Sequence, residues 1–277
     1  MTNRLNFDRV QYRQQNYSVD NTLFYAWFEA MYTRIDIVIC VAVKRNDLVE
    51  IVTEMEAEMR KYEKIGNRFD SQSELSEVNQ HAFEKDIPIS DELCKMLVEC
   101  QLHCNNTLGY FDISVSSTSD FKRANTAYTL NANTVRFSHP GVQLDLSGYL
   151  KGYALGQLMA ITQEKGLEDV LINVGNSSIF AKGNHPFGQG WKIKVPETER
   201  EIVLHNECLT TSGNSERTKW PILNPLSGEL VKNRKPVSVI TTLPDQGEVL
   251  SKVAYLAPKH ELESVLGNYG AILVASE

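Results

Sequence analysis

Apolar residues three and four positions apart mark several amphipathic helices along this chain. The predicted helices cover residues 46–66, 90–109, 150–166 and about 246–256. The first begins at a capping residue, Asn46 or Asp47, and the second begins at Ser90. Residues 69–79 are typical of a further capped helix start, with Ser71 or Ser73 as the cap.

Short apolar runs rich in β-branched residues predict strands between these helices. The predicted strands cover residues 34–43, 142–146, 169–175, 191–195, 201–204, 208–212, 237–242 and 271–275. Residues 110–114 are expected to form a short strand or an extended loop. Because helices and strands do not alternate regularly, the pattern favours an α+β fold over a doubly wound sheet.

The composition is that of an ordinary globular protein with a sizeable core. Of the 277 residues, 42% are apolar and 23% are charged. The formal net charge of −7 argues against a nucleic-acid-binding protein, which needs an excess of basic residues. The five cysteines are expected to be reduced and mostly buried. Cys100 and Cys104 beside His103 lack the second ligand pair of a metal site.

The chain is expected to hold one domain over residues 26–277, preceded by a polar, loosely ordered segment over residues 1–25. No apolar run is long enough to span a membrane. The first residues lack the apolar core of a secretory signal, so the chain as written is expected to be cytoplasmic. An exported protein whose signal had been trimmed would show the same sequence.

Polar clusters at the turns are the candidates for chemistry. In LDLSGYLKGYALG, residues 144–156, Lys151 stands among glycines where a predicted strand meets a helix. This turn is either a plain tight connection or a place where free amides and an ammonium meet an anion. Residues 210–228 form a long polar loop, which is either functional or an ordinary surface excursion. Glu248 and Lys252 are four apart on a predicted helix, which is typical of a solvent-facing ion pair.

Six segments in one order resemble motifs of the FAD:protein FMN transferase family, known as the ApbE flavin transferases. They are SELSEVN (73–79), GYFDISV (109–115), LDLSGYLKGYALG (144–156), INVGNSSIFAKG (172–183), TTSGNSER (210–217) and ILNPLSGEL (222–230). The likeness extends from about residue 31 to residue 257. It implies the ApbE-like fold, with mixed and mostly antiparallel sheets flanked by helices.

The resemblance implies a transferase that uses FAD. Members of the family, with Mg²⁺, move FMN from FAD to a threonine or serine hydroxyl of a partner protein and release AMP. Such an attack on a pyrophosphate requires neutralised phosphate charges and a positioned hydroxyl. Two alternatives stay open, namely a relative that binds FAD or another nucleotide without catalysis and an FAD pyrophosphatase.

The resemblance also assigns residues to the flavin site. Met31 and Thr33 fall on the family's first motif, whose middle glycine is Tyr32 in this chain. The other implied nucleotide-binding residues are Phe111, Asp112, Lys151, Gly152, Tyr153, Thr211, Ser212 and Gly213. The implied catalytic residues are Lys151, Asn224 and Glu248.

The implied metal site departs from the family's pattern. The family's Mg²⁺ is held by a backbone carbonyl, which falls on Leu150 here, and by an aspartate and a threonine of one helix. The aspartate position is Glu248 and the threonine position is Lys252, whose charged ammonium has no lone pair for a metal. The family's assisting histidine and aspartate fall on Pro221 and Asn224.

These changes lead to a hypothesis about the cation at the site. Lys252 is expected to pair with Glu248 and to supply one positive charge to the pyrophosphate, so that FAD binds without Mg²⁺. A shifted alignment of the helix would instead make Asp245 a metal ligand.

Overall fold

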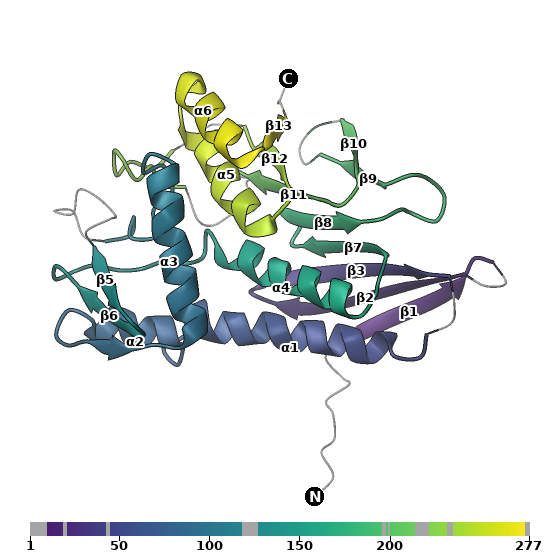
Figure 1. Ribbon diagram of the computed structural model, residues 1–277, viewed down its shortest axis with the longest axis horizontal. Coiled ribbons are helices and arrows are strands. Elements are labelled where there is room, and N and C mark those ends of the chain that lie inside the picture. The colour runs from purple at the N-terminus through teal and green to yellow at the C-terminus, as the bar shows by residue number, and fades with distance from the viewer. Residues whose placement is uncertain are drawn as a thin grey trace, which may run out of the picture.

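The computed structural model describes residues 10–18, 21–42, 45–117, 127–195, 198, 200–213, 222–231 and 235–274. An eight-stranded sheet dominates this part of the chain and carries helices on one face (Figure 1). The α+β class predicted from the mixed order of helices and strands is confirmed.

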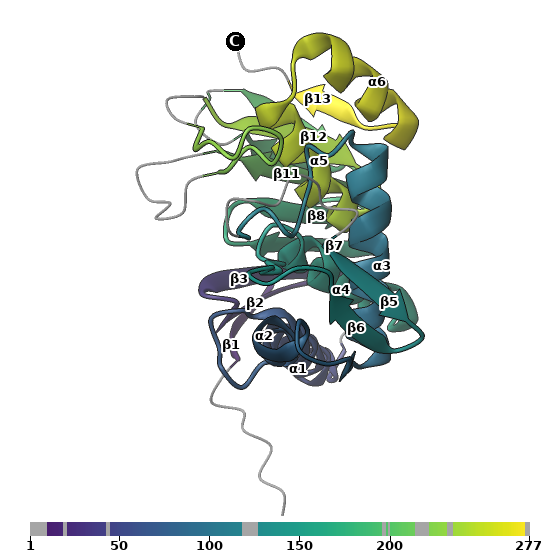
Figure 2. The same cartoon turned by 90° about the vertical axis from the view of Figure 1, so that its left-hand side faces the viewer.

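The strands of the large sheet come from both ends of the chain. They are β1 (Gln11–Asn16), β2 (Thr22–Ala30), β3 (Thr33–Val41), β7 (Asp169–Val174), β8 (Ser178–Lys182), β11 (Glu207–Ser212), β12 (Val237–Thr241) and β13 (Ile272–Val274). Their spatial order is β1-β2-β3-β7-β8-β11-β12-β13, and every neighbouring pair is antiparallel. Figure 2 shows the sheet as a stack that rises from β1 to β13.

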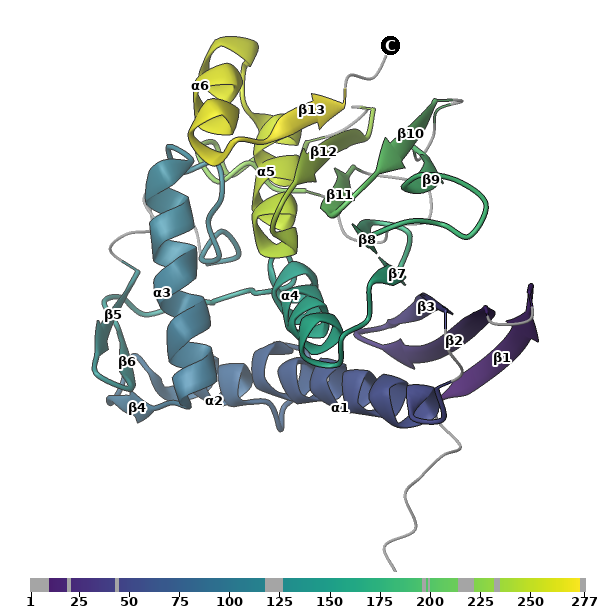
Figure 3. The same cartoon turned by 45° about the vertical axis from the view of Figure 1, so that its right-hand side comes forward.

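Three helices cover one face of this sheet, as Figure 3 shows. Helix α1 (Leu48–Gly66) lies on β2, α4 (Leu150–Glu164) lies on β7 and β8, and α5 (Pro244–Leu256) lies on β11 and β12. Helix α4 packs against both α1 and α5. The apolar residues of the helices and the inward residues of the strands form one large core, whose burial is the main stabilising contribution to the fold.

The opposite face of the sheet is covered in part by the antiparallel pair β9 (Trp191–Lys194) and β10 (Glu201–Leu204). Trp191 and Leu204 of this pair are buried in a second apolar cluster with Ile179 and Leu209 of the sheet. The remaining elements are α2 (Glu74–His81), α3 (Asp91–Asn106), α6 (Lys259–Tyr269) and a small sheet of β4 (Ile87–Pro88), β6 (Thr134–Phe137) and β5 (Tyr128–Asn131). Over the described ranges, no helix combines the length and the apolar character that crossing a bilayer requires.

The predicted helix starts are confirmed. Asp47 is the N-cap of α1. The Ser73 hydroxyl accepts a hydrogen bond from the Ser76 N–H at the start of α2, and the Ser90 hydroxyl accepts one from the Leu93 N–H at the start of α3. Each serine thereby satisfies one of the first-turn amides that have no partner inside the helix.

The expectation of one loosely ordered segment over residues 1–25 is wrong for residues 11–16 and 22–25. The first of these ranges is strand β1, and the second begins β2, which pairs with β3. Side chains alternate along β2, so that Phe24, Ala26 and Phe28 are buried. Strand β1 lies at the edge of the sheet, and all of its residues are exposed. Because an exposed edge strand can consist of polar residues, β1 lacks the apolar pattern by which a strand is predicted from sequence. Residues 1–9 lie outside the described ranges.

The strand predicted over residues 142–146 is also wrong. Residues 142–146 belong to no strand in the described part of the chain. The side chain of Asn79 makes the hydrogen bonds that a neighbouring strand would make. Asn79 of α2 accepts a hydrogen bond from the Leu144 N–H at 2.8 Å and donates one to the Leu144 carbonyl at 2.9 Å. The next amide, that of Asp145, donates to the Ile113 carbonyl at 2.7 Å, so residues 110–114 form the loop beside it.

Replacing Asn79 by alanine is expected to lower the free energy of unfolding by about 2 kcal/mol, since it leaves two backbone groups of the buried Leu144 without partners. Urea unfolding followed by circular dichroism measures the change. The matched control is Gln80→Ala, which truncates the neighbouring exposed side chain of the same helix. Equal stability of the two variants would contradict the bridging role of Asn79.

Candidate functional site

Turns from several elements meet at the N-terminal end of α4. The Lys151 ammonium donates a hydrogen bond to the Ser177 hydroxyl in the β7–β8 turn at 2.6 Å. The Ser177 carbonyl accepts from the Thr211 N–H of β11 at 2.8 Å. Thr33 closes the other side of the turn, since a Cβ built on Gly175 would lie only 2.4 Å from its hydroxyl. The structure thus brings together Thr33, Lys151 and Thr211, which lie far apart in the sequence.

A buried carboxylate with two lysines forms the electrostatic centre of this region. Glu248 of α5 is 3% exposed. Its Oε2 accepts a hydrogen bond from the Lys252 ammonium at 2.8 Å, and its Oε1 accepts one from the Ser178 hydroxyl at 2.5 Å. The Lys151 ammonium lies 3.7 Å from Oε1. The predicted Glu248–Lys252 pair is therefore present, but it lies at the junction of α4, α5 and β8 instead of facing solvent.

The two ammonium groups control the ionisation of Glu248. Burial alone raises the pKa of this carboxyl, but the charges of Lys252 and Lys151 and the hydrogen bonds outweigh it and lower the pKa to about 2. The group is therefore a carboxylate at neutral pH and a weak base.

Two glycines of LDLSGYLKGYALG allow this arrangement. A Cβ on Gly148 would lie 2.9 Å from Cε of Lys252, so the lysine side chain crosses directly over the turn. A Cβ on Gly152 would lie 2.4 Å from the Pro244 carbonyl oxygen and 2.7 Å from Cγ of Glu248. Glycine at position 152 therefore lets α4 and α5 approach closely enough for Lys151 and Glu248 to interact.

Small hydroxyl side chains line the sheet beneath α5. Ser178, Thr210 and Ser212 are buried there. The Ser212 hydroxyl lies 2.8 Å from that of Ser251 on α5. Ser212 was predicted to bind the nucleotide, but its hydroxyl is turned into this helix–sheet contact. Sequence reasoning missed Ser177 and Ser178, although the INVGNSS segment pointed to their turn.

Phe111 and Asp112 lie on a neighbouring turn, toward α3. The buried Phe111 ring contacts His103 and Tyr149, with ring centres 6.3 Å apart in both cases. Asp112 accepts hydrogen bonds from the Ser114 N–H and hydroxyl, both at 2.7 Å. Burial raises the pKa of the Asp112 carboxyl, and the two bonds from Ser114 oppose the rise. No contact joins Phe111 or Asp112 to Lys151 among the described residues.

Other predicted residues have structural surroundings of their own. Tyr153 is buried with its ring against Tyr62, on the side of α4 that faces α1. The Asn224 side chain accepts from the Leu226 N–H at 2.9 Å and so closes its own turn. Met31 adopts a left-handed backbone in the β2–β3 turn, with φ of 52°.

The last residue of the predicted nucleotide-binding turn also has a packing role. Gly213 follows β11, and a Cβ there would lie 2.7 Å from the Pro236 backbone. Pro221, the implied histidine position, lies outside the described residues.

The residues at the implied metal position do not fit a divalent cation. Mg²⁺ takes oxygen ligands in near-octahedral geometry at about 2.1 Å. Here the Lys252 ammonium holds one oxygen of Glu248, and the Ser178 hydroxyl holds the other. A metal on either oxygen would displace a hydrogen bond and stand beside a fixed positive charge. Over the ranges that the structure covers, no three His, Cys, Asp or Glu side chains gather as a metal-binding group.

The two other implied ligands have different neighbours. Leu150, whose backbone carbonyl is the implied ligand, is the first residue of α4. Its side chain packs against Gly66, where an added Cβ would lie 2.8 Å from Cδ1 of Leu150. Asp245, the ligand under a shifted alignment, lies 3.7 Å from Nε2 of the buried His103. Neither makes a contact with the Glu248 carboxylate within the described residues.

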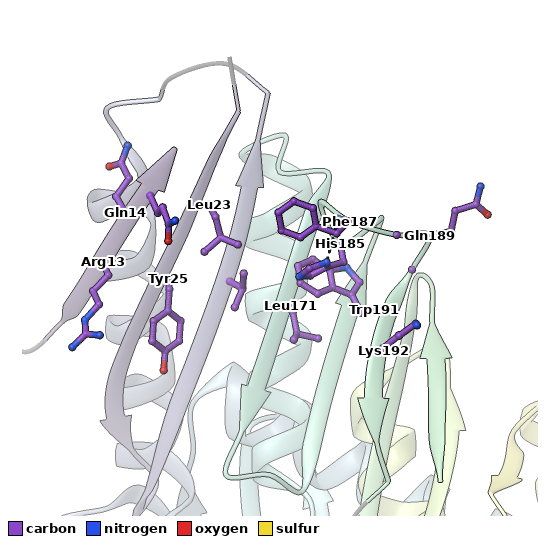
Figure 4. A pocket seen from close by; sticks show the side chains of 14 residues that line it. Arg13, Gln14, Leu23, Tyr25, Leu171, His185, Phe187, Gln189, Trp191 and Lys192 are labelled. Atoms are coloured by element: carbon purple, nitrogen blue, oxygen red, sulfur yellow. Dashed lines mark hydrogen bonds between the residues drawn. The ribbon is translucent and has the colours of Figure 1, made fainter. Parts of the chain in front are cut away.

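A wide groove lies elsewhere on the molecule. It has a volume of about 1170 Å³ and is lined by residues of β1, β2, β3 and β7, by residue 185 and by residues 187–192 (Figure 4). Leu23 and Leu171 form part of its floor, with Phe187 and Trp191 beside them. Because Leu23 is near the start of β2, this groove is at the opposite end of the strand from the β2–β3 turn. None of the predicted site residues lines it.

Comparisons with known proteins find the same family that the six sequence motifs resemble. The model of the ApbE family matches residues 31–273. The chain is 25% identical over 213 residues to the FAD:protein FMN transferase of Chlamydia muridarum and 24% identical over 208 residues to that of Chlamydia trachomatis. The first alignment covers 65% of this chain and 66% of the relative, and the second covers 64% and 65%. The chain therefore matches just under two thirds of the length of these relatives.

Solved structures agree on the fold. The flavin transferase ApbE from Vibrio cholerae superposes with a TM-score of 0.79 at 17% identity, covering 96% of this chain and 95% of that one. The apo flavinyl transferase ApbE from Pseudomonas stutzeri gives a TM-score of 0.76, also at 17% identity, with 97% and 92% covered. With a family model that spans most of its length, this chain belongs to the ApbE family.

Proposed function

We propose that this protein transfers FMN from FAD to a threonine or serine hydroxyl of a partner protein and releases AMP. Its family and the printed activity of its relatives in Chlamydia support the proposal. The structural observation that carries it is the pair of ammonium groups on Lys151 and Lys252, held by Ser177 of the β7–β8 turn and by Glu248 of α5. A cationic site of this kind suits the diphosphate that links the two halves of FAD.

In this reaction the acceptor hydroxyl oxygen forms a bond to the phosphorus on the FMN side of the diphosphate. The bond from that phosphorus to the bridging oxygen breaks, the electron pair leaves with AMP, and the hydroxyl proton passes to water. Negative charge grows on the phosphate oxygens during this exchange, and we assign Lys151, which is held by Ser177, to stabilising it. The low pKa of Glu248 makes it unsuited to take the proton, so we assign it to holding the two lysines.

Purified protein mixed with FAD, Mg²⁺ and a threonine-containing acceptor protein should give a fluorescent acceptor band and an equal amount of AMP. Lys151→Ala is expected to lower the rate of AMP release by about 100-fold, the usual cost of one charge-stabilising group. The control Lys259→Ala removes an equally charged side chain that is 90% exposed on α6 and should leave the rate unchanged. AMP without a labelled acceptor, or FAD binding without AMP, would contradict protein flavin transfer.

A further inference from the structure

We propose that Lys151 and Lys252 form a built-in cationic site that binds the diphosphate of FAD without a divalent metal ion. This inference rests on the proposed function, because FAD is the ligand, and it concerns the source of the positive charge. The observations that carry it are the charge balance of the cluster, its direction of exposure and the way in which Lys252 is held.

The cluster carries one excess positive charge. Two ammonium groups lie against a single carboxylate, since Lys252 is 2.8 Å and Lys151 is 3.7 Å from the oxygens of Glu248. The lysine side chains are 28% and 21% exposed, whereas the Glu248 side chain is 4% exposed. The negative charge therefore lies beneath the positive charges, and an approaching anion meets the ammonium groups first.

Lys252 keeps a hydrogen-bond donor for a ligand. An ammonium has three N–H donors. Lys252 uses one on Oε2 of Glu248, at 2.8 Å, and another on the Glu248 backbone carbonyl, at 3.1 Å. Lys151 uses one on the Ser177 hydroxyl. Each ammonium thus retains donor capacity that no other described residue takes up.

The position of Lys252 is fixed before any ligand arrives. Its side chain lies against Gly148 on one side, and its ammonium is anchored twice to Glu248, one helical turn earlier. Because the side chain is already ordered, binding an anion costs little further side-chain entropy. A flexible surface lysine would lack this advantage.

Backbone amides at the start of α4 add to the site. Among the described residues, no acceptor takes the N–H of Lys151 or of Gly152. These first-turn amides carry part of the positive end of the helix dipole.

Calorimetric titration of FAD into the full chain, once with Mg²⁺ and once with EDTA, tests the proposal. We expect dissociation constants that agree within about twofold, because the ammonium groups provide the charge in both buffers. A loss of tenfold or more in EDTA would overturn the inference while leaving FAD as the ligand. No binding in either buffer would instead reject the proposed function and the inference that rests on it.

Two variants distinguish the effect of the Lys252 charge on FAD binding from an effect on folding. Lys252→Thr removes the ammonium and introduces an oxygen ligand, and we expect FAD affinity in EDTA to fall at least tenfold and to recover in part with Mg²⁺. Lys252→Met removes the charge at similar length, and its affinity should fall without recovery. Lys259→Thr is the matched control on an exposed position, with no expected change. Wild-type affinity of the Lys252→Met variant in EDTA would overturn the proposal, and circular dichroism verifies that each variant is folded.

Discussion

An alanine at position 152 is expected to lower the free energy of unfolding by about 2–3 kcal/mol, although alanine usually stabilises a helix interior relative to glycine. The added Cβ would stand 2.4 Å from the Pro244 carbonyl oxygen and 2.9 Å from Cα of Asp245. Both atoms belong to backbone, which cannot rotate out of the way as a side chain can. Helices α4 and α5 would therefore have to separate, and urea unfolding at neutral pH measures the cost.

The same helix provides a matched control for Gly152→Ala. A Cβ on Gly156 would meet only Cγ of Pro244, at an ordinary contact distance of 3.8 Å. Gly156→Ala is therefore expected to be neutral or to stabilise the protein by up to about 1 kcal/mol. The separation of α4 from α5 should also weaken FAD binding by the Gly152→Ala variant alone. Two variants of equal stability would show that the helices are not in close contact at position 152.

Replacing Glu248 by glutamine is expected to be the second large perturbation, with a loss of roughly 3 kcal/mol at pH 7, because two ammonium groups lose their buried counter-ion. The effect should depend on pH. The folded-state pKa of Glu248 is lowered to about 2, so its contribution is full above the ordinary glutamate pKa of about 4.3. The contribution is lost as the pH falls from about 4.3 toward about 2.

Urea unfolding of the wild type and of Glu248→Gln at pH 7, 5, 4 and 3 measures this dependence. The stability difference should stay constant from pH 7 to 5 and shrink below. The control Glu54→Gln removes a carboxylate from an exposed ion pair with Lys165 and should cost less than about 1 kcal/mol. A difference for Glu248→Gln that grows on acidification would reverse the sign and refute the charge assignment.

Local signals in the sequence predicted the helices well where a cap and an apolar face coincide. Helix α1 follows Asp47 and buries Leu48, Met55 and Met59 at helical spacing. Helix α6 has similar spacing in Leu262, Val265 and Leu266 but was missed. Its N-cap is a proline without a side-chain hydrogen bond, so the usual start signal is absent.

Strand partners depend on contacts that local patterns do not contain. Residues 142–146 have the composition of a strand, yet the amide of Asn79 takes the hydrogen bonds that a neighbouring strand would. Strand β2 alternates clearly between buried and exposed residues, but its first residues were grouped with the polar start of the chain. The polar composition of residues 1–25 as a whole concealed the short alternating pattern at the start of β2.

The candidate site shows the same limit. The spacing of Glu248 and Lys252 predicted that they pair, but spacing does not reveal which side of a helix is buried. The surroundings of the pair come from Gly148, Gly152 and Ser178, which lie 70 to 104 residues away in the chain. Such contacts follow from the packing of α4 and β8 against α5, and they become visible only in the folded structure.

The pairing of β3 with β7 has a consequence for how the chain reaches its native state. Ile35 pairs with Val174 and Cys40 pairs with Asp169, so the centre of the sheet joins residues more than a hundred positions apart. During synthesis the hairpin of β2 and β3 is complete long before β7 leaves the ribosome. Until then, the backbone groups along one edge of β3 have no strand to pair with. Closing so large a loop carries an entropic cost before its contacts form. Folding of this protein is therefore expected to be slow, and the edge of β3 is expected to stay unpaired until β7 has been synthesised.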